Sequence, residues 1–153
     1  TGSGGKIRVI GVSGSPPSSV EVEINLPTAG DKTYPRSVQK FTRLVIELGS
    51  RYPFVEPRVV IKTPILHPNV YSSGQVCLGA KWLPTEGLDL LVKRLIQIVT
   101  YDLSILNEKS PANRDALAWF AVAQRDNPSA FPTARDTSLS TPKASSISWK
   151  NTT

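Results

Sequence analysis

The two halves of this chain are joined by the stretch HPNVYSSGQVCL, which spans residues 67–78. It lies inside a longer segment, residues 64–87, that shows no helical or strand period and is interrupted by prolines and glycines. A segment this long without a period is uncommon inside a compact domain and is more often functional than not. The only Cys and the only His of the chain both lie in it. We therefore expect the functional site here, between the elements that precede and follow it.

Four β-strands are predicted before this segment, at residues 6–12, 20–26, 41–48 and 58–63. The second of them, VEVEINL, alternates apolar and polar residues, which is the period of a half-buried strand. Turns and loops rich in Pro, Gly, Ser or Asp separate the strands. The first 63 residues therefore predict an antiparallel meander.

Two helices are predicted after the segment. The first shows the spacing of a helix with one apolar face. Its apolar positions are Leu88, Leu91, Val92, Leu95, Ile98, Val99 and Leu106. The second is expected to begin near Ser110, which suits an N-cap before Pro111, and to continue to Gln124. Its apolar positions are Ala116, Trp119, Phe120 and Ala123. This order of elements predicts an α+β fold with helices packed on one face of the meander.

The length of 153 residues fits a single domain, which we predict at residues 6–132. Residues 1–5, TGSGG, are interpreted as a linker or a cloning remnant, because the chain does not begin with Met. Pro, Ser, Thr and Ala dominate from residue 133, which predicts a flexible tail over residues 133–153. Trp149 in that tail is either a lone exposed aromatic residue or an anchor for a docking partner.

The composition excludes several classes of protein. One Cys rules out a disulfide framework, and one Cys with one His cannot complete an ordinary zinc site. No apolar run is long enough to span a membrane, so we expect no membrane partner, and we expect the protein in the cytoplasm. The net charge is +6, but the basic residues are scattered and form no stripe interleaved with aromatics. This pattern favours a solvated surface, or a docking face for an acidic protein, over nucleic-acid binding.

Three residues of the stretch carry candidate chemistry. Cys77 is the only thiol nucleophile, although a free Cys is commonly a small buried apolar residue; Gly74 and Gly79 flank it and would let a bound chain come close. Asn69 offers a fixed amide donor of the kind that an acyl-transfer oxyanion needs, or it is simply a turn-forming residue. His67 is either a structural imidazole in a tight turn or a base that activates the thiol. Sequence spacing leaves these alternatives open.

Residues 67–78 resemble the active-site segment of ubiquitin-conjugating enzymes, in a form similar to that of the SUMO-conjugating enzyme. The match includes the His-Pro-Asn triplet, Gly74 three residues before Cys77, and the Cys-Leu pair. Other segments resemble the family in the same order. They are YPFVEPRV at residues 52–59, Trp82 with Pro84, and SPANRDA at residues 110–116. The resemblance extends from about residue 20 to residue 125.

The resemblance implies a four-stranded antiparallel meander, an active-site loop, and helices packed on one face. It also implies that Cys77 takes a ubiquitin-like protein as a thioester from an activating enzyme. A lysine amine of a protein substrate then attacks the thioester and forms an isopeptide bond. The resemblance implies no cofactor for this chain, because the activating enzyme uses the ATP, and it makes a ligase a further expected partner.

The resemblance also assigns roles to residues near Cys77. Asn69 would stabilise the oxyanion or order the loop around it, with His67 and Pro68 as its structural support. Ser110 matches a position that orients the incoming lysine, and it remains an equally good helix N-cap. Tyr71 matches a residue that lines the lysine channel, with loop packing as its alternative role. Asp115, at the start of the predicted second helix, is counted with the supporting residues.

The chain departs from the family at several points. The amphipathic helix that normally precedes the sheet is not found before Lys6, and the spacing between Cys77 and Trp82 is shorter than usual. Compact forms like this one resemble bacterial relatives, which occur beside a ubiquitin-like protein, an activating enzyme and a deubiquitinase-like peptidase, often in antiphage operons. A bacterial origin is therefore expected, with a divergent eukaryotic or viral member as the alternative.

Other functions remain open at this stage. One is a non-catalytic member of the same fold that binds a modifier or a partner enzyme, although such variants usually lack the Cys. A Cys-His hydrolase would require His67 beside the sulfur of Cys77. A basic nucleic-acid-binding module would require a contiguous basic face.

Overall fold

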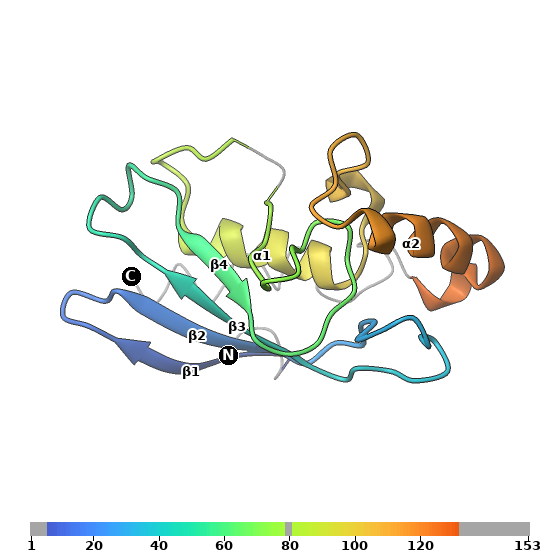
Figure 1. Ribbon diagram of the computed structural model, residues 1–153. Coiled ribbons are helices and arrows are strands. Elements are labelled where there is room, and N and C mark those ends of the chain that lie inside the picture. The colour runs from blue at the N-terminus through green and yellow to red at the C-terminus, as the bar shows by residue number, and fades with distance from the viewer. Residues whose placement is uncertain (1–5, 79–80, 132–153) are drawn as a thin grey trace.

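The computed structural model describes residues 6–78 and 81–131 of the chain. The strands are β1 (Ile7–Ser13), β2 (Ser19–Ile24), β3 (Thr42–Glu47) and β4 (Arg58–Ile61). The helices are α1 (Leu88–Val99), the short 3-10 helix η1 (Leu103–Ile105), α2 (Arg114–Asp126) and the short 3-10 helix η2 (Pro128–Ala130). The strands form one antiparallel sheet in the order β1-β2-β3-β4, with α1 across one face and α2 beyond the end of the strands (Figure 1). The predicted α+β fold and the four-stranded meander are confirmed.

Side-chain alternation fixes which face of each strand enters the core. Val22 and Ile24 of β2 are buried, as the alternating pattern predicted. Val22 lies opposite Leu44 of β3, and Ile24 lies opposite Ile7 of β1, so all four side chains share one face. A slip of one residue would turn this set toward solvent, which is why the register is strongly specified.

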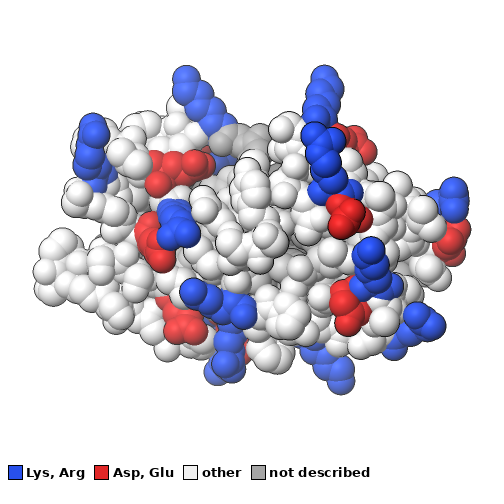
Figure 2. All heavy atoms as spheres, in the orientation of Figure 1, with Lys and Arg blue, Asp and Glu red and all other residues white. Residues whose placement is uncertain are grey.

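Glu23 lies on the other face of β2 and is nevertheless buried. Arg8 of β1 and Arg43 of β3 pair with its carboxylate at 2.6 and 3.0 Å. The hydrogen bond from Arg8, followed by that from Arg43, lowers the pKa of Glu23 to about 2. On the face shown in Figure 2, acidic side chains lie beside the basic ones and no continuous basic field forms. A nucleic-acid-binding module therefore gains no support from this face.

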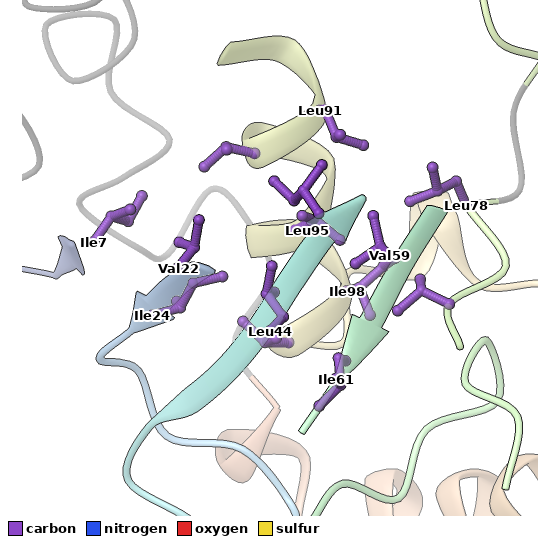
Figure 3. Close-up of a cluster of buried hydrophobic side chains, with 14 of the residues drawn as sticks. Ile7, Val22, Ile24, Leu44, Val59, Ile61, Leu78, Leu91, Leu95 and Ile98 are labelled. Atoms are coloured by element: carbon purple, nitrogen blue, oxygen red, sulfur yellow. The ribbon is translucent and has the colours of Figure 1, made fainter. Parts of the chain in front are cut away.

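The main core lies between the sheet and α1. Figure 3 shows Leu91, Leu95 and Ile98 of α1 pointing toward the sheet residues Leu44 and Val59. These five side chains are almost completely buried. Burial of each such side chain contributes about 1.5–3 kcal/mol. Packing against the sheet therefore holds α1 in place, and its N-cap residue makes no side-chain cap hydrogen bond.

The predicted first helix was too long at its C-terminal end. α1 ends at Val99, and Tyr101 follows with a φ of 58°, in the left-handed region that does not continue a right-handed helix. Leu106 was predicted on the apolar face of this helix. It lies beyond η1 instead and packs against a second apolar cluster.

The prediction that Ser110 caps the second helix was wrong. α2 begins at Arg114, and the N-cap is Asn113, whose side-chain oxygen accepts the N–H of Ala116 at 3.0 Å. Asn and Ser are comparable N-cap residues, and Asn113 stands three positions after Ser110. Ser110 is exposed and lies before the helix.

α2 packs on a second cluster of buried residues and loop aromatics. The apolar positions predicted for this helix are correct, since Ala116, Phe120 and Ala123 are buried and Trp119 is half-buried. The buried members of the cluster are Ala29, Tyr34, Tyr101, Phe120, Ala123 and Phe131. Tyr101 stacks on Phe120 with ring centroids 5.6 Å apart. The cluster therefore ties α2 to the segment that follows α1.

Some predictions concern parts of the chain outside the described residues. These are the linker at residues 1–5 and the tail at residues 133–153, including Trp149. Within residues 6–78 and 81–131, no helix has the length and apolar character needed to cross a membrane.

Candidate active site

His67 opens the site as a buried residue in a tight turn. Its Nδ1 accepts the backbone N–H of Asn69 at 2.8 Å, and its ring lies 4.7 Å from that of Tyr101. Burial lowers the pKa of His67 to about 3, against an opposing effect of the Ile98 backbone. In the described part of the chain no hydrogen bond joins His67 to Cys77. This geometry favours the structural role of His67 and gives the Cys-His hydrolase hypothesis no support.

The fully buried side chain of Asn69 makes hydrogen bonds to the backbone of three other residues of the site. Its Nδ2 donates to the carbonyl oxygens of Cys77 at 3.2 Å and Ile105 at 2.9 Å. Its Oδ1 accepts the backbone N–H of Asn107 at 2.9 Å. One side chain therefore joins the turn that carries the thiol to the segment after η1. Of the two roles considered for Asn69, this arrangement favours ordering of the loop.

Cys77 is half-buried at the end of a short turn that Gly74 shapes. The backbone N–H of Cys77 donates to the carbonyl oxygen of Asn69 at 2.7 Å, which fixes the turn from both sides. Gly74 has a φ of 93°, and a Cβ added there would lie 2.5 Å from the carbonyl oxygen of Ile61. The space beside Gly74 is therefore occupied by β4. The lack of a side chain at Gly74 is thus required by its packing against β4, and Gly79 lies outside the described residues.

Asn107 is a site residue that the sequence reasoning missed. Its Nδ2 lies 3.8 Å from the Sγ of Cys77 and donates to the carbonyl oxygen of Ser110 at 2.6 Å. Its Oδ1 accepts the backbone N–H of Ser110 at 3.2 Å. An Asn that bonds to nearby backbone is a common turn former, and its position three residues before Ser110-Pro111 was the available signal. Asn107 was not predicted as a site residue because the helical spacing of Leu106, the residue before it, predicted that the first helix continued to this point.

The remaining predicted residues are Pro68, Ser110, Tyr71 and Asp115. The carbonyl oxygen of Pro68 accepts the N–H of Ala112 at 2.8 Å, which fastens the His-Pro-Asn turn to the segment before α2. Ser110 is exposed, with its backbone N–H and C=O both held by Asn107. Tyr71 is 47% exposed, in the turn between Asn69 and Cys77. Asp115 is exposed in the first turn of α2, where its negative charge suits the helix dipole.

The arrangement brings one thiol and two amide side chains together on a rigid backbone. A thiol nucleophile with amide donors beside it is suited to acyl transfer, in which an oxyanion forms and collapses. Among the described residues, no group of three or more His, Cys, Asp or Glu side chains could hold a metal ion.

Comparison with known proteins defines the class to which this fold and site belong. A family model described as "Ubiquitin-conjugating enzyme" matches residues 18–133. This match covers well over half of the chain, and the chain therefore belongs to the ubiquitin-conjugating enzyme family.

Individual relatives agree with this assignment. "Ubiquitin-conjugating enzyme E2 15" of Schizosaccharomyces pombe is 31% identical over 107 residues, which cover 60% of this chain and 59% of that protein. "Ubiquitin-conjugating enzyme E2 2" of Yarrowia lipolytica is 34% identical over 109 residues, 69% of each chain. The solved structure of S. cerevisiae Ubc12 superimposes with a TM-score of 0.60 at 22% identity, over 83% of this chain and 68% of that one. It supports the fold, and the chain spans only 59% of the length of the S. pombe relative.

Proposed function

We propose that this chain is a conjugating enzyme that carries a ubiquitin-like protein as a thioester on Cys77 and transfers it to a lysine amine. The observation that carries the proposal is the position of Cys77 in a chain of this family. It is the only thiol of the sequence, it is half-buried, and it is fixed through Asn69 to the Asn107 segment.

In the loading step the thiolate of Cys77 attacks the acyl carbon of a thioester presented by the activating enzyme. A new carbon–sulfur bond forms, the old one breaks, and the thiolate of the activating enzyme departs. The reaction exchanges one thioester for another and needs little further activation. This suits a site whose only imidazole, His67, is buried with a lowered pKa.

In the transfer step a neutral lysine amine attacks the acyl carbon held on Cys77. A carbon–nitrogen bond forms, the carbon–sulfur bond breaks, sulfur leaves as a thiolate, and the nitrogen loses a proton to solvent. Desolvation near the site lowers the pKa of an incoming lysine and favours its neutral form. Ser110 and Tyr71, both exposed near the loop, are proposed to orient that lysine and to line its path.

The proposed partners follow from the same reaction. They are a ubiquitin-like modifier, an activating enzyme, a lysine-bearing protein and a ligase, with no cofactor on this chain. The form of residues 67–78 supports a modifier system similar to that of SUMO. The short spacing between Cys77 and Trp82 is the observation behind a proposed bacterial origin in an antiphage operon, which the neighbouring genes would test. A cytoplasmic location is proposed with it.

A thioester assay tests the proposal directly. The chain is mixed with the modifier, its activating enzyme and ATP, and a non-reducing gel is expected to show a shifted band that a reducing agent removes. Cys77→Ala should lose the band, because the only thiol is gone. Cys77→Ser should give a band that resists reduction, because an oxygen ester does not exchange with thiols.

The activating enzyme must first form its own thioester with the modifier, which shows that the pair is active. If that control succeeds and no band depends on Cys77, the chain does not carry an acyl group. The non-catalytic binding module would then be the better function.

A further inference from the structure

The side chain of Asn107 lies 3.8 Å from the sulfur of Cys77, whereas the amide of Asn69 donates to the backbone carbonyl oxygen of Cys77. We propose that Asn107 donates the hydrogen bond to the oxyanion formed at Cys77, and that Asn69 is a positioning residue that acts through Asn107. This inference rests on the proposed function, because it concerns the acyl group that Cys77 would carry.

The amide of Asn69 has no free hydrogen for an oxyanion. An Asn side chain has two N–H donors on Nδ2. In Asn69 these face the carbonyl oxygens of Cys77 and Ile105, and the residue is fully buried. Release of either bond would leave a buried carbonyl without its hydrogen-bond partner, which is unfavourable. Donation from Asn69 to a reacting oxygen would therefore oppose the structure of the turn.

Asn107 has the free donor that Asn69 lacks. One Nδ2 hydrogen of Asn107 is taken by the carbonyl oxygen of Ser110 at 2.6 Å, and the other is available toward Cys77. The distance of 3.8 Å to Sγ is long for a strong bond to sulfur. The oxyanion, however, is the oxygen on the carbon attached to Sγ, and a donor 3.8 Å from sulfur reaches that oxygen when the oxygen points toward Asn107. Asn107 is half-buried, so an acyl group on Cys77 has access to it.

The orientation of Asn107 is fixed before any reaction takes place. Its backbone N–H donates to Oδ1 of Asn69, and its side chain clamps both backbone groups of Ser110. A donor held in place in this way does not reorganise when charge develops, which is the condition for effective oxyanion stabilisation. Removal of Asn69 would free the Asn107 segment and so act on the reaction through Asn107.

The step itself balances without any further reactant. The nitrogen nucleophile adds to the acyl carbon, and the carbonyl electron pair moves to oxygen, which then accepts a hydrogen bond from the Asn107 amide N–H. The pair then returns, the carbon–sulfur bond breaks, and Cys77 leaves as a thiolate. The nitrogen gives its proton to solvent.

The test uses a small acyl group, so that it does not depend on the modifier. The full chain is acylated on Cys77 with the benzyl thioester of N-acetylglycylglycine, which releases benzyl thiol, and excess reagent is removed. Discharge by hydroxylamine and by free lysine is followed by intact mass. The same acylated chain, unfolded in urea, gives the rate of discharge in the absence of a folded site.

Asn107→Ala is expected to slow discharge by about a hundredfold toward the rate of the unfolded chain. The factor should be the same for hydroxylamine and lysine, because both pass through the same oxyanion, whereas a residue that only shaped the path of the acceptor would affect them unequally. Asn69→Ala should also slow discharge, and the double variant should be no slower than Asn107→Ala alone.

Asn113→Ala is the matched control, because it removes an Asn side chain that caps α2 and leaves the Asn107 amide in place. Its discharge rate should stay within about twofold of the parent chain, since the proposed donor to the oxyanion is retained. If Asn107→Ala proves unstable in thermal unfolding, Asn107→Asp keeps the oxygen that accepts from Ser110 and still removes the donor.

Three results would overturn the proposal. The first is an unchanged discharge rate in a folded Asn107 variant, and the second is equal slowing by Asn113→Ala. The third is a double variant whose loss is the product of the two single losses, because Asn69 would then act independently of Asn107. A chain that forms no thioester with its modifier but loses hydroxylamine discharge in Asn107→Ala would refute the proposed function and leave this inference standing.

Discussion

Gly74 is the residue at which the turn before Cys77 tolerates least change. Gly74→Ala places a Cβ 2.5 Å from the carbonyl oxygen of Ile61 and holds a non-glycine residue at a φ of 93°. The backbone conformation alone costs about 1–2 kcal/mol, and the overlap adds to it. Urea unfolding should therefore show a loss of at least about that size. Gly49→Ala is the matched control, because an added Cβ meets nothing within 4 Å there, and an unchanged midpoint in both variants would contradict this account.

Again at the scale of single residues, the sequence alone predicted His67, Asn69 and Cys77 as site residues, but it did not predict Asn107. His67, Asn69 and Cys77 lie within eleven consecutive positions, from 67 to 77, and their types already suggested a nucleophile beside an amide. Asn107 meets Asn69 only because the chain returns after α1, and the two residues are 38 positions apart. No local pattern encodes a contact of that kind. The burial of both Asn69 donors was equally invisible, since it depends on the carbonyl of Ile105.

The start of α2 gives a prediction that separates the two candidate caps. Asn113→Ala removes the bond to the N–H of Ala116 and should reduce the free energy of unfolding by about 1 kcal/mol. Ser110→Ala removes no cap and should change it by less than about 0.5 kcal/mol. Thermal unfolding of the two variants side by side measures the difference. Equal losses, or a larger loss for Ser110→Ala, would restore Ser110 as the capping residue.

Elements with a sustained period were predictable, and element ends were not. The alternation in β2 and the apolar face of α1 each repeat several times along the chain. The side chains whose burial stabilises these elements can therefore be identified from the sequence. The end of α1 depends on Tyr101, which adopts a left-handed φ while packing between His67 and Phe120. Leu106 stands at a helical spacing from the apolar residues of α1, but it packs against the second cluster. Spacing alone therefore predicted its position wrongly.

At the scale of the whole molecule, the described residues form two apolar clusters, and the candidate site lies where they meet. Val76 and Leu78, on either side of Cys77, belong to the cluster between the sheet and α1. His67 stacks on Tyr101, which belongs to the cluster under α2. Loosening of either cluster should therefore disturb the turn that carries the thiol. The buried neutral imidazole between them links the stability of the whole fold to pH.

His67 makes stability fall in mild acid. Its pKa is about 6.5 when unfolded and about 3 when folded, so below pH 6.5 the unfolded chain binds a proton that the folded chain excludes. The free energy of unfolding should be independent of this group above pH 6.5 and fall by up to about 1.4 kcal/mol per pH unit between 6.5 and 3. Urea unfolding from pH 7.5 to 5 measures the effect, because His67 is the only His and Glu23, with its pKa lowered from 4.5 to about 2, contributes at lower pH. Glu56, whose pKa is raised by burial, acts in the opposite sense and so does not account for a loss of stability in acid. His67→Asn keeps an acceptor for the Asn69 N–H but cannot be protonated, so it should flatten the slope. A slope that persists in that variant would place its cause elsewhere in the fold.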